Sequence, residues 1–293
     1  MMMLKINKKI YTACGVIALV LAACSDGTSI EPNTFAHASS SSISDDLSSA
    51  SVNGSVLWNP ELGDFRVHTA RYAMSWPKNA IADGRWFWEV LTDAADGGES
   101  RVLWPVELDE GEDPLRSVMD ACHGICGTAI LDNGSMGYSP FVTIGFSIAK
   151  DSMGNPVPVD VSNWEGLCVT YTSDAAPMLV LDLGDSLAEV LRYGLPQVSL
   201  PKATDGVAFS QCFSWSDFKL PPWVTDIPQS WRSNVGEQAA KQLVAVRFRI
   251  QAYMGEYKFN LKYIGAKADN PVVFEREDDF QRRISPKGSW NNP

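Results

Sequence analysis

Long apolar runs, positive charge and histidine are all scarce in this sequence of 293 residues. The only extended apolar run, from Gly15 to Ala23, is too short to cross a bilayer. Lysine and arginine number 24 against 35 acidic residues, so the formal net charge is −11. A chain this acidic repels nucleic acid and anionic lipid surfaces, and neither is expected as a partner. Neutral ligands such as glycans, and divalent cations, are compatible with this charge.

The N-terminal segment has the order of a secretory signal peptide. A basic region with three lysines (residues 5–9) precedes the apolar run, which ends in Leu21-Ala22-Ala23-Cys24. These four residues resemble the bacterial lipobox, in which the cysteine begins the mature protein and carries the lipid. We therefore expect a signal peptide over residues 1–23 and a lipid anchor on Cys24. By the same resemblance, Ser25 favours an outer membrane lipoprotein, at the cell surface or facing the periplasm. An ordinary signal peptide is the alternative.

The composition divides the remaining chain into three parts. Residues 24–56 are rich in serine and poor in aromatic side chains, which predicts a flexible linker. Residues 57–266 are expected to form a β-sandwich domain, and residues 267–293 a polar tail. Removal of residues 1–23 takes away three lysines and no acidic residue, so the formal net charge of the mature chain becomes −14.

Apolar residues within the predicted domain recur mainly with a period of two. This period predicts strands with one face toward a core and the other toward water. No strand–helix–strand rhythm occurs, so we expect an all-β fold with one or two short helices. The clearest strand patterns are Val142 to Ile148, Trp86 to Val90, Leu167 to Tyr171, Val244 to Ile250 and Tyr257 to Tyr263, and the predicted helices start at Asp113-Pro114 and Glu237.

Six cysteines are present, and four of them remain once Cys14 leaves with the signal peptide and Cys24 carries the lipid. An even number in an exported chain predicts two disulfides, and three connectivities are possible. We favour Cys122–Cys126 and Cys168–Cys212. Zinc binding by the four thiolates is the alternative, although a CxxxC spacing occurs only once.

The motif Gly184-Asp185-Ser186-Leu187 resembles the GDSL family of esterases. In that family the serine is the nucleophile, and a later Asp-x-x-His supplies the base. Here His37, His68 and His123 all precede Ser186, so no histidine follows in the order that the family requires. No local signature marks a pair of glycosidase carboxylates either. A turn at the end of a strand therefore explains the motif better than a hydrolase does.

The segment from Asp93 to Ser100 combines carboxylates with glycine, a composition that suits a hard cation such as Ca²⁺. Its spacing is not that of an EF-hand. Asp93 and Asp96 are the candidate calcium ligands, and a polar turn is the alternative interpretation.

The sequence contains ten tryptophans, and aromatic rings can stack on the C–H faces of sugars while their polar edges stay in contact with water. Most of these tryptophans are expected in the core, and Trp164, Trp215 and Phe218 are interpreted as structural. The candidates for carbohydrate binding, several of them flanked by turn residues, are Trp88, Tyr138, Tyr193, Trp223 and Trp231.

A series of motifs runs through the predicted domain. They are Gly145-Phe146-Ser147-Ile148, Trp164-x-Gly166-Leu167-Cys168-Val169-Thr170-Tyr171-x-Ser173, Leu200-Pro201, Trp215-x-Asp217-Phe218 and Pro222-Trp223. This series resembles galactose-binding-like jelly rolls, in particular family 11 carbohydrate-binding modules, within a lipoprotein of the Fibrobacter type. The resemblance implies a two-sheet sandwich, often with structural Ca²⁺, whose concave face can bind β-glucans.

Three functions follow from these patterns, in order of preference. The first is non-catalytic binding of a plant-wall β-glucan or cellulose by a membrane-anchored lipoprotein. The second is a structural or adhesion protein of the cell envelope that uses the same sandwich for protein contacts. The third is a glycan or ester hydrolase, with Ser186 as the nucleophile of the esterase version.

Overall fold

The structure is a computed structural model of the chain, and it describes residues 56–60, 66–69, 85–86, 88–111, 113–204 and 206–268. All of these residues belong to the compact unit Ser49–Pro293. The predicted signal peptide, Cys24 and His37 lie outside the described residues. So do the predicted linker and tail, apart from residues 56, 267 and 268.

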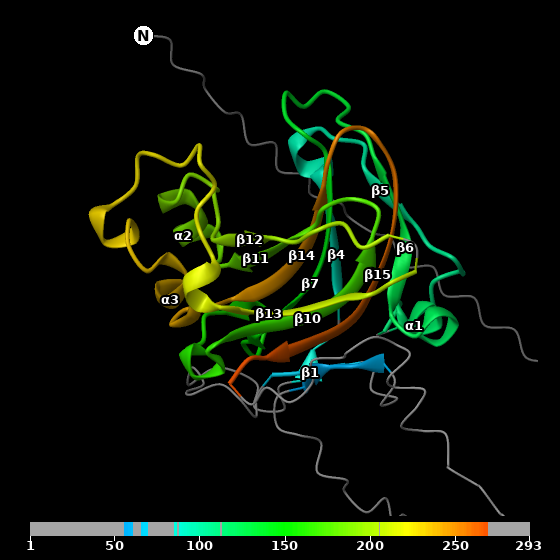
Figure 1. Cartoon of the computed structure of the whole chain (residues 1–293), viewed down its shortest axis with the longest axis horizontal. Coiled ribbons are helices and arrows are strands. Elements are labelled where there is room, and N and C mark those ends of the chain that lie inside the picture. Colours follow the sequence, from blue (N-terminus) through cyan, green and yellow to red (C-terminus); the bar gives the residue numbers. More distant parts are fainter. Residues whose placement is uncertain are drawn as a thin grey trace, which may run out of the picture. The chain divides into compact units, whose positions relative to one another are not determined.

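Two antiparallel sheets make up most of the described fold (Figure 1). The six-stranded sheet contains, in spatial order, β13 (Phe209–Ser214), β10 (Gly166–Ser173), β15 (Gly255–Ala266), β6 (Ile125–Leu131) and β5 (Arg101–Leu103), while β1 (Val56–Trp58) also pairs with β15. The five-stranded sheet contains β12 (Gln197–Ser199), β11 (Met178–Asp182), β14 (Ala245–Gln251), β7 (Phe141–Ser147) and β4 (Glu89–Thr92).

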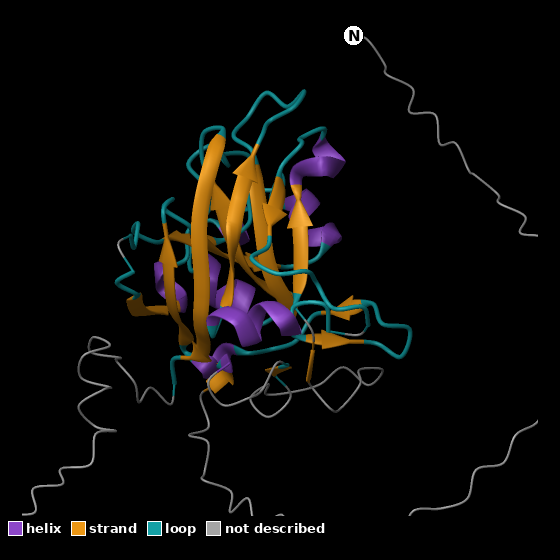
Figure 2. Cartoon of the chain, turned by 90° about the vertical axis from the view of Figure 1, so that its right-hand side faces the viewer, coloured by secondary structure: helices purple, strands orange, loops and turns teal. Residues whose placement is uncertain are grey.

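Shorter elements surround these sheets, and Figure 2 shows the helices as brief purple segments beside the strands. Two small sheets pair β2 (Val67–His68) with β3 (Arg85–Trp86) and β8 (Ala149–Lys150) with β9 (Pro156–Val157). The helices are α1 (Arg116–Cys122), α2 (Asp185–Val190), α3 (Val235–Ala240), and the 3₁₀ turns η2 (Asp93–Asp96), η3 (Ser162–Trp164), η4 (Trp215–Asp217) and η5 (Gln229–Trp231). None of the helices in the described ranges has the length and hydropathy needed to span a membrane.

The chain passes repeatedly from one large sheet to the other. The connections β4–β5, β6–β7, β10–β11, β12–β13 and β14–β15 all cross between the sheets. This is the winding of a jelly-roll β-sandwich, so the predicted all-β class and architecture are confirmed. The winding matters for function because it brings residues distant in sequence onto one sheet face.

The core lies between the two sheets and is built from the alternating apolar positions that the period of two predicts. In β7, Val142, Ile144 and Phe146 are fully buried, and Phe248 of the neighbouring β14 is 1% exposed. The residues interpreted as structural, Trp164, Trp215 and Phe218, are also buried. The alternation within these strands therefore separates a core face from an outer face.

Strand β15 departs from the predicted alternation of Tyr257 to Tyr263. Its pairing with β10 shifts register between Thr170 and Tyr171, so Tyr171 pairs with Leu261 whereas Thr170 pairs with Tyr263. Such a bulge inserts one extra residue and reverses the facing of the positions that follow. Ile264, rather than Tyr263, consequently joins the core.

Three local predictions need correction. The strand expected from Trp86 to Val90 is divided into β3 and β4, with Trp88 between them. Helix α1 is present, but its N-cap is Leu115 and not Asp113. The described residues hold three α-helices rather than one or two, because α2 follows the turn at Gly184.

Candidate functional site

The outer face of the five-stranded sheet, turned away from the core, carries polar and charged side chains. In β14, Val246, Phe248 and Ile250 belong to the core, so Arg247 and Arg249 lie on the outer face. Residues opposite one another on adjacent strands share a face. The positions that pair into this surface, which we call the charged face, include Glu89, Leu91, Thr143, Gly145, Ser147, Met178, Val180 and Asp182.

The middle of the charged face is nearly closed to solvent. Thr143 is 2% exposed, Ser147 0% and Arg247 8%. A guanidinium buried to this degree needs partners. Arg247 has two, because its Nη1 lies 3.1 Å from Oε2 of Glu89 and its Nε lies 3.3 Å from Oδ2 of Asp182. One side chain thereby joins β4, β14 and β11.

Gly145 makes the reach of Arg247 possible. It lies between Arg247 and Glu89, opposite both, on the intervening strand β7. A Cβ at position 145 would come within 2.7 Å of the Cδ of Arg247. The absence of a side chain there lets the Arg247 stem pass over β7.

Glu89 receives two further donors. Nζ of Lys150 lies 3.0 Å from its Oε1, and the Ser147 hydroxyl donates to the same oxygen at 3.4 Å. Burial alone would raise the pKa of Glu89. The hydrogen bond from Lys150 and the charge of Arg247 outweigh that effect, so the pKa is lower than its ordinary value. Glu89 therefore stays ionised at neutral pH and is held rigidly.

Arg249 lies two residues further along the same face and has different surroundings. Its Nε donates to Oγ1 of Thr143 at 3.4 Å, and its guanidinium carbon lies 4.8 Å from the centre of the Phe141 ring. No carboxylate of the described residues forms an ion pair with it. Burial lowers the pKa of Arg249, whereas the charge of Asp182 acts in the opposite direction.

Tyr138 borders the same end of the charged face. It is 50% exposed, and its hydroxyl donates to Oδ2 of Asp96 at 2.7 Å. Desolvation and this hydrogen bond raise the pKa of Tyr138 to about 12. The phenol therefore stays protonated, and its ring is held with much of its surface open to solvent.

The predicted calcium ligands have other roles. Asp93 is fully buried, and its carboxylate accepts hydrogen bonds from the Ser100 amide (3.1 Å), the Ser100 hydroxyl (2.6 Å) and the Phe141 amide (2.8 Å). Asp96 accepts the Tyr138 hydroxyl. No group of three or more His, Cys, Asp or Glu side chains in the described ranges is arranged to hold a metal. Asp93 therefore fixes the loop that leads into Phe141, and the two aspartates do not fit a calcium site.

The predicted aromatic candidates divide into exposed and buried residues. Tyr138, Tyr193 and Trp223 are 50%, 72% and 62% exposed. Trp88 and Trp231 are only 5% and 7% exposed and belong to the core, so neither can stack on a ligand. Trp88 packs edge-on against Trp58 and Phe146, with ring centroids 4.9 Å and 5.1 Å away. Trp88 lies between β3 and β4, and its ring packs into the core.

Tyr193 and Trp223 come from separate loops that meet at Gly194. A Cβ at position 194 would lie 3.1 Å from Cη2 of Trp223. Tyr193 adopts a left-handed backbone conformation, with φ of 60°, which is uncommon for a residue with a side chain. The two exposed rings lie close to the end of the sheet that carries α2, whereas Tyr138 lies at the Phe141 end.

No histidine whose side chain the structure describes is placed to activate Ser186. Ser186 is exposed in the first turn of α2. His123 ends α1, and Figure 1 shows α1 and α2 at opposite ends of the described fold. His123 is therefore out of reach of Ser186, and the turn interpretation of the Gly-Asp-Ser-Leu motif holds over the esterase one.

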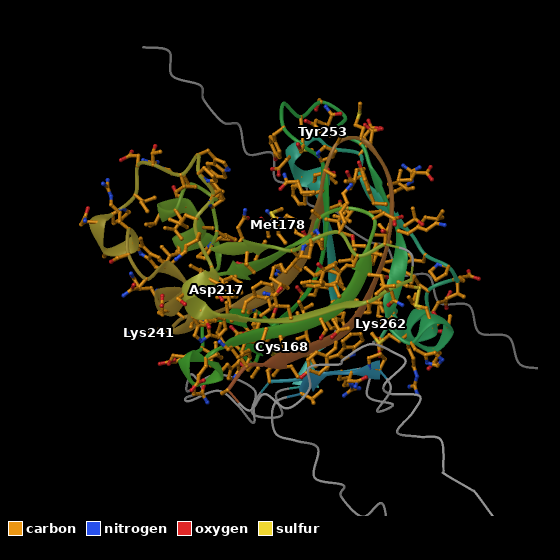
Figure 3. All side chains as sticks on the ribbon, viewed as in Figure 1. Cys168, Met178, Asp217, Lys241, Tyr253 and Lys262 are labelled. Atoms are coloured by element: carbon orange, nitrogen blue, oxygen red, sulfur yellow. A yellow bond between two sulfur atoms is a disulfide. The ribbon has the colours of Figure 1, made fainter. Side chains whose placement is uncertain are left out.

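Both favoured disulfides form. Cys122–Cys126 joins the end of α1 to β6, and Cys168–Cys212 joins opposed positions of β10 and β13 (Figure 3). The four cysteines are thus paired with one another, which removes the zinc alternative for them.

Sequence reasoning missed the charged face itself. The alternation in β14 was clear, but Arg247 and Arg249 were interpreted as the water-facing side of a strand. Glu89 had no local signal, because its partners lie 61 and 158 residues further along the chain. Exposed Tyr253 and Met254, in the connection between β14 and β15, were also missed; Figure 3 labels Tyr253. Two arginines on one face of a buried strand are the signal that could have revealed the site.

Comparison with known proteins gives structural likenesses only. No protein-family model and no curated protein matches the chain. A family 11 carbohydrate-binding module from Clostridium thermocellum, solved with a β-1,3-1,4-mixed-linked tetrasaccharide, is 8% identical with a TM-score of 0.32; the match covers 67% of this chain and 93% of that one.

Two other solved structures are similar to a comparable extent. CtCBM11 in solution is 13% identical with a TM-score of 0.30, over 61% of this chain and 88% of that one. A mutant of the family 29 carbohydrate-binding module CBM29-2 is 8% identical with a TM-score of 0.23, over 60% and 98%. None of the three reaches a TM-score of 0.5, and the architecture described above rests on the strand pairing of this chain.

Proposed function

We propose that this protein binds a polysaccharide across the charged face without acting on it chemically. The observation that carries the proposal is the charged face with exposed aromatic rings near both of its ends. Sugar hydroxyls bond well to carboxylates and guanidinium groups, and the C–H faces of sugar rings stack on aromatic side chains. Few other ligands use both kinds of group along an extended surface.

The two parts of the site have different roles. Tyr138 at one end, and Tyr193 with Trp223 at the other, provide surfaces for stacking. Between them, Glu89 and Asp182 are held in place by Arg247, so their free lone pairs have fixed directions. Groups fixed before binding lose little conformational entropy when the ligand arrives. A long glycan can therefore gain affinity from many weak contacts.

The proposed ligand class is a plant-wall polysaccharide such as cellulose or mixed-linkage β-glucan. The proposed location is the outer membrane, with the lipid on Cys24 as the anchor and the serine-rich segment as a spacer. Both rest on the N-terminal sequence and the family resemblance. Structural calcium stays a prediction for positions other than Asp93 and Asp96.

Retention on insoluble polysaccharide tests the proposal. The folded mature chain would be incubated with cellulose and with mixed-linkage glucan, with and without calcium, and the bound fraction measured. Tyr138→Ala and Trp223→Ala should each weaken binding about fivefold, since loss of one stacking ring costs on the order of 1 kcal/mol. Leu103→Ala, at an exposed position on the other sheet, is the control and should bind as the parent does. Failure of the parent protein to bind any polysaccharide would refute the function.

A further inference from the structure

We propose that Arg249 binds an anionic oxygen group of the glycan, either a carboxylate or a sulfate ester. The inference rests on the proposed function and specifies the ligand further. The preferred glycan is then an acidic polysaccharide. Arg249 is the residue that distinguishes this polysaccharide from a neutral one built from the same sugar backbone.

The argument begins with a difference between two arginines on one strand. Arg247 and Arg249 lie on the same face of β14, and each is largely or partly buried. Arg247 is neutralised by Glu89 and by Asp182. Arg249 has one hydroxyl and one aromatic ring as its contacts among the described residues. Among the described residues, Arg249 therefore lacks the carboxylate partners that Arg247 has.

The donors of Arg249 are mostly unused. A guanidinium has five N–H groups and stays charged at any physiological pH. Its Nε–H donates to Thr143, and no hydrogen bond or ion pair joins its two terminal nitrogens to the described residues. Those nitrogens form a fork whose spacing matches the two oxygens of a carboxylate, or two oxygens of a sulfate. The Phe141 ring contacts the guanidinium, whose central carbon lies 4.8 Å from the ring centre.

Two nearby carboxylates act on Arg249 through their charge but form no ion pair with it, and they limit where an anionic ligand can bind. The charges of Asp182 and Asp96 both act on Arg249. Asp182, however, accepts hydrogen bonds from Arg247 and from the Gly184 amide. Asp96 accepts one from the Tyr138 hydroxyl. These charges would repel an anion placed elsewhere on the face. The site therefore suits one acidic group held at the fork, and the net negative charge of the chain disfavours unspecific binding of polyanions.

The sugar that carries the acidic group has a stacking surface beside the fork. Tyr138 is half exposed and is close enough to Arg249 for the guanidinium charge to influence the pKa of its phenol. A uronic acid or a sulfated sugar could place its ring against Tyr138 and its anion against Arg249. This geometry joins the electrostatic and the aromatic parts of the site at one end of the charged face.

Matched polysaccharides provide the test. The folded mature chain would be titrated with polygalacturonate and with its fully methyl-esterified form, which differ only in the charge of the carboxyl group. A sulfated galactan and its desulfated form make the second pair, and mixed-linkage β-glucan is the neutral reference. At least one acidic member should bind about tenfold more tightly than its neutral counterpart, and that preference should decline as NaCl rises from about 0.05 to about 0.5 M. The pair that shows the preference identifies the anion.

Variants then assign the preference to Arg249. Arg249→Gln should abolish it, so that the acidic and the neutral member of the pair bind equally, while Arg249→Lys should restore only part of it, since an ammonium lacks the fork. Arg101→Gln, an exposed arginine on the six-stranded sheet, should change nothing. Equal binding of acidic and neutral members, or a preference that survives Arg249→Gln, would overturn the inference while glycan binding stands. Absence of binding to all five polysaccharides would refute the proposed function as well.

Discussion

The two sheets present outer faces of opposite character. On the six-stranded sheet, neighbouring strands are joined by short groups: Cys168 bonds to Cys212, and the hydroxyls of Thr170 and Ser210 lie 2.9 Å apart. On the five-stranded sheet, long charged side chains reach across strands, and Arg247 connects two carboxylates that belong to different neighbours. Both faces bind their strands together, but by different chemistry.

The difference indicates which face is available for a ligand. A disulfide offers no hydrogen-bond donor, and the two hydroxyls bond to each other. Carboxylates and guanidinium groups have more donor and acceptor positions than their protein partners occupy, and Arg249 has several unused donors. Both outer faces are therefore expected to stabilise the fold, and that of the five-stranded sheet is expected to provide recognition as well.

The largest expected effect is loss of the Cys168–Cys212 disulfide. It closes a loop with a sequence separation of 44. Chain-entropy arguments give such a bond about 4 kcal/mol of stability, so Cys168→Ser with Cys212→Ser should lower the free energy of unfolding by about that amount in urea titrations. Removal of Cys122–Cys126, with a separation of only 4, should cost about 2 kcal/mol. Glycan affinity of the folded fraction should not change, and a loss of affinity would contradict the division between the two faces.

Arg247→Met is expected to have the next largest effect. The substitution keeps much of the apolar stem but leaves Glu89 and Asp182 without their shared cation. Breaking a largely buried ion pair from one side costs about 3 kcal/mol, which urea unfolding would measure. Thr170→Val removes one hydroxyl contact on the opposite face and should cost less than about 1 kcal/mol. Similar losses for the two variants would show that the charged face is no more important to stability than the other.

The sequence predicted the scaffold well because its signals are local. Alternation in Val142 to Phe146 identifies a strand from a few neighbouring residues, and the count of four cysteines limited the pairings to three. The disulfides could therefore be chosen correctly, and the all-β class followed from the period of two.

The site was harder to predict because its contacts are distant in sequence. Glu89 and Arg247 become neighbours only through the jelly-roll winding, and no spacing between them encodes that contact. Trp88 and Trp231 were predicted at the surface but lie in the core. The residues next to an aromatic side chain do not reveal whether it faces solvent or the core. Asp93 looked like a cation ligand because burial and amide donors cannot be seen in a sequence.

The smallest expected effect concerns the pH dependence of stability. The pKa of Glu89 is lower in the folded protein than its ordinary value of 4.5, since the donors from Lys150 and Arg247 outweigh the opposing effect of burial. A lowered pKa means that the ionised form stabilises the fold, fully above about pH 5 and progressively less as the pH falls through the folded-state pKa. Glu89→Gln removes this term, so its unfolding free energy should lie below that of the parent at neutral pH, with the gap narrowing below about pH 4.5. Urea titrations at several pH values would measure both curves. Parallel curves down to about pH 3 would show that the ion pairs of the charged face do not support the fold.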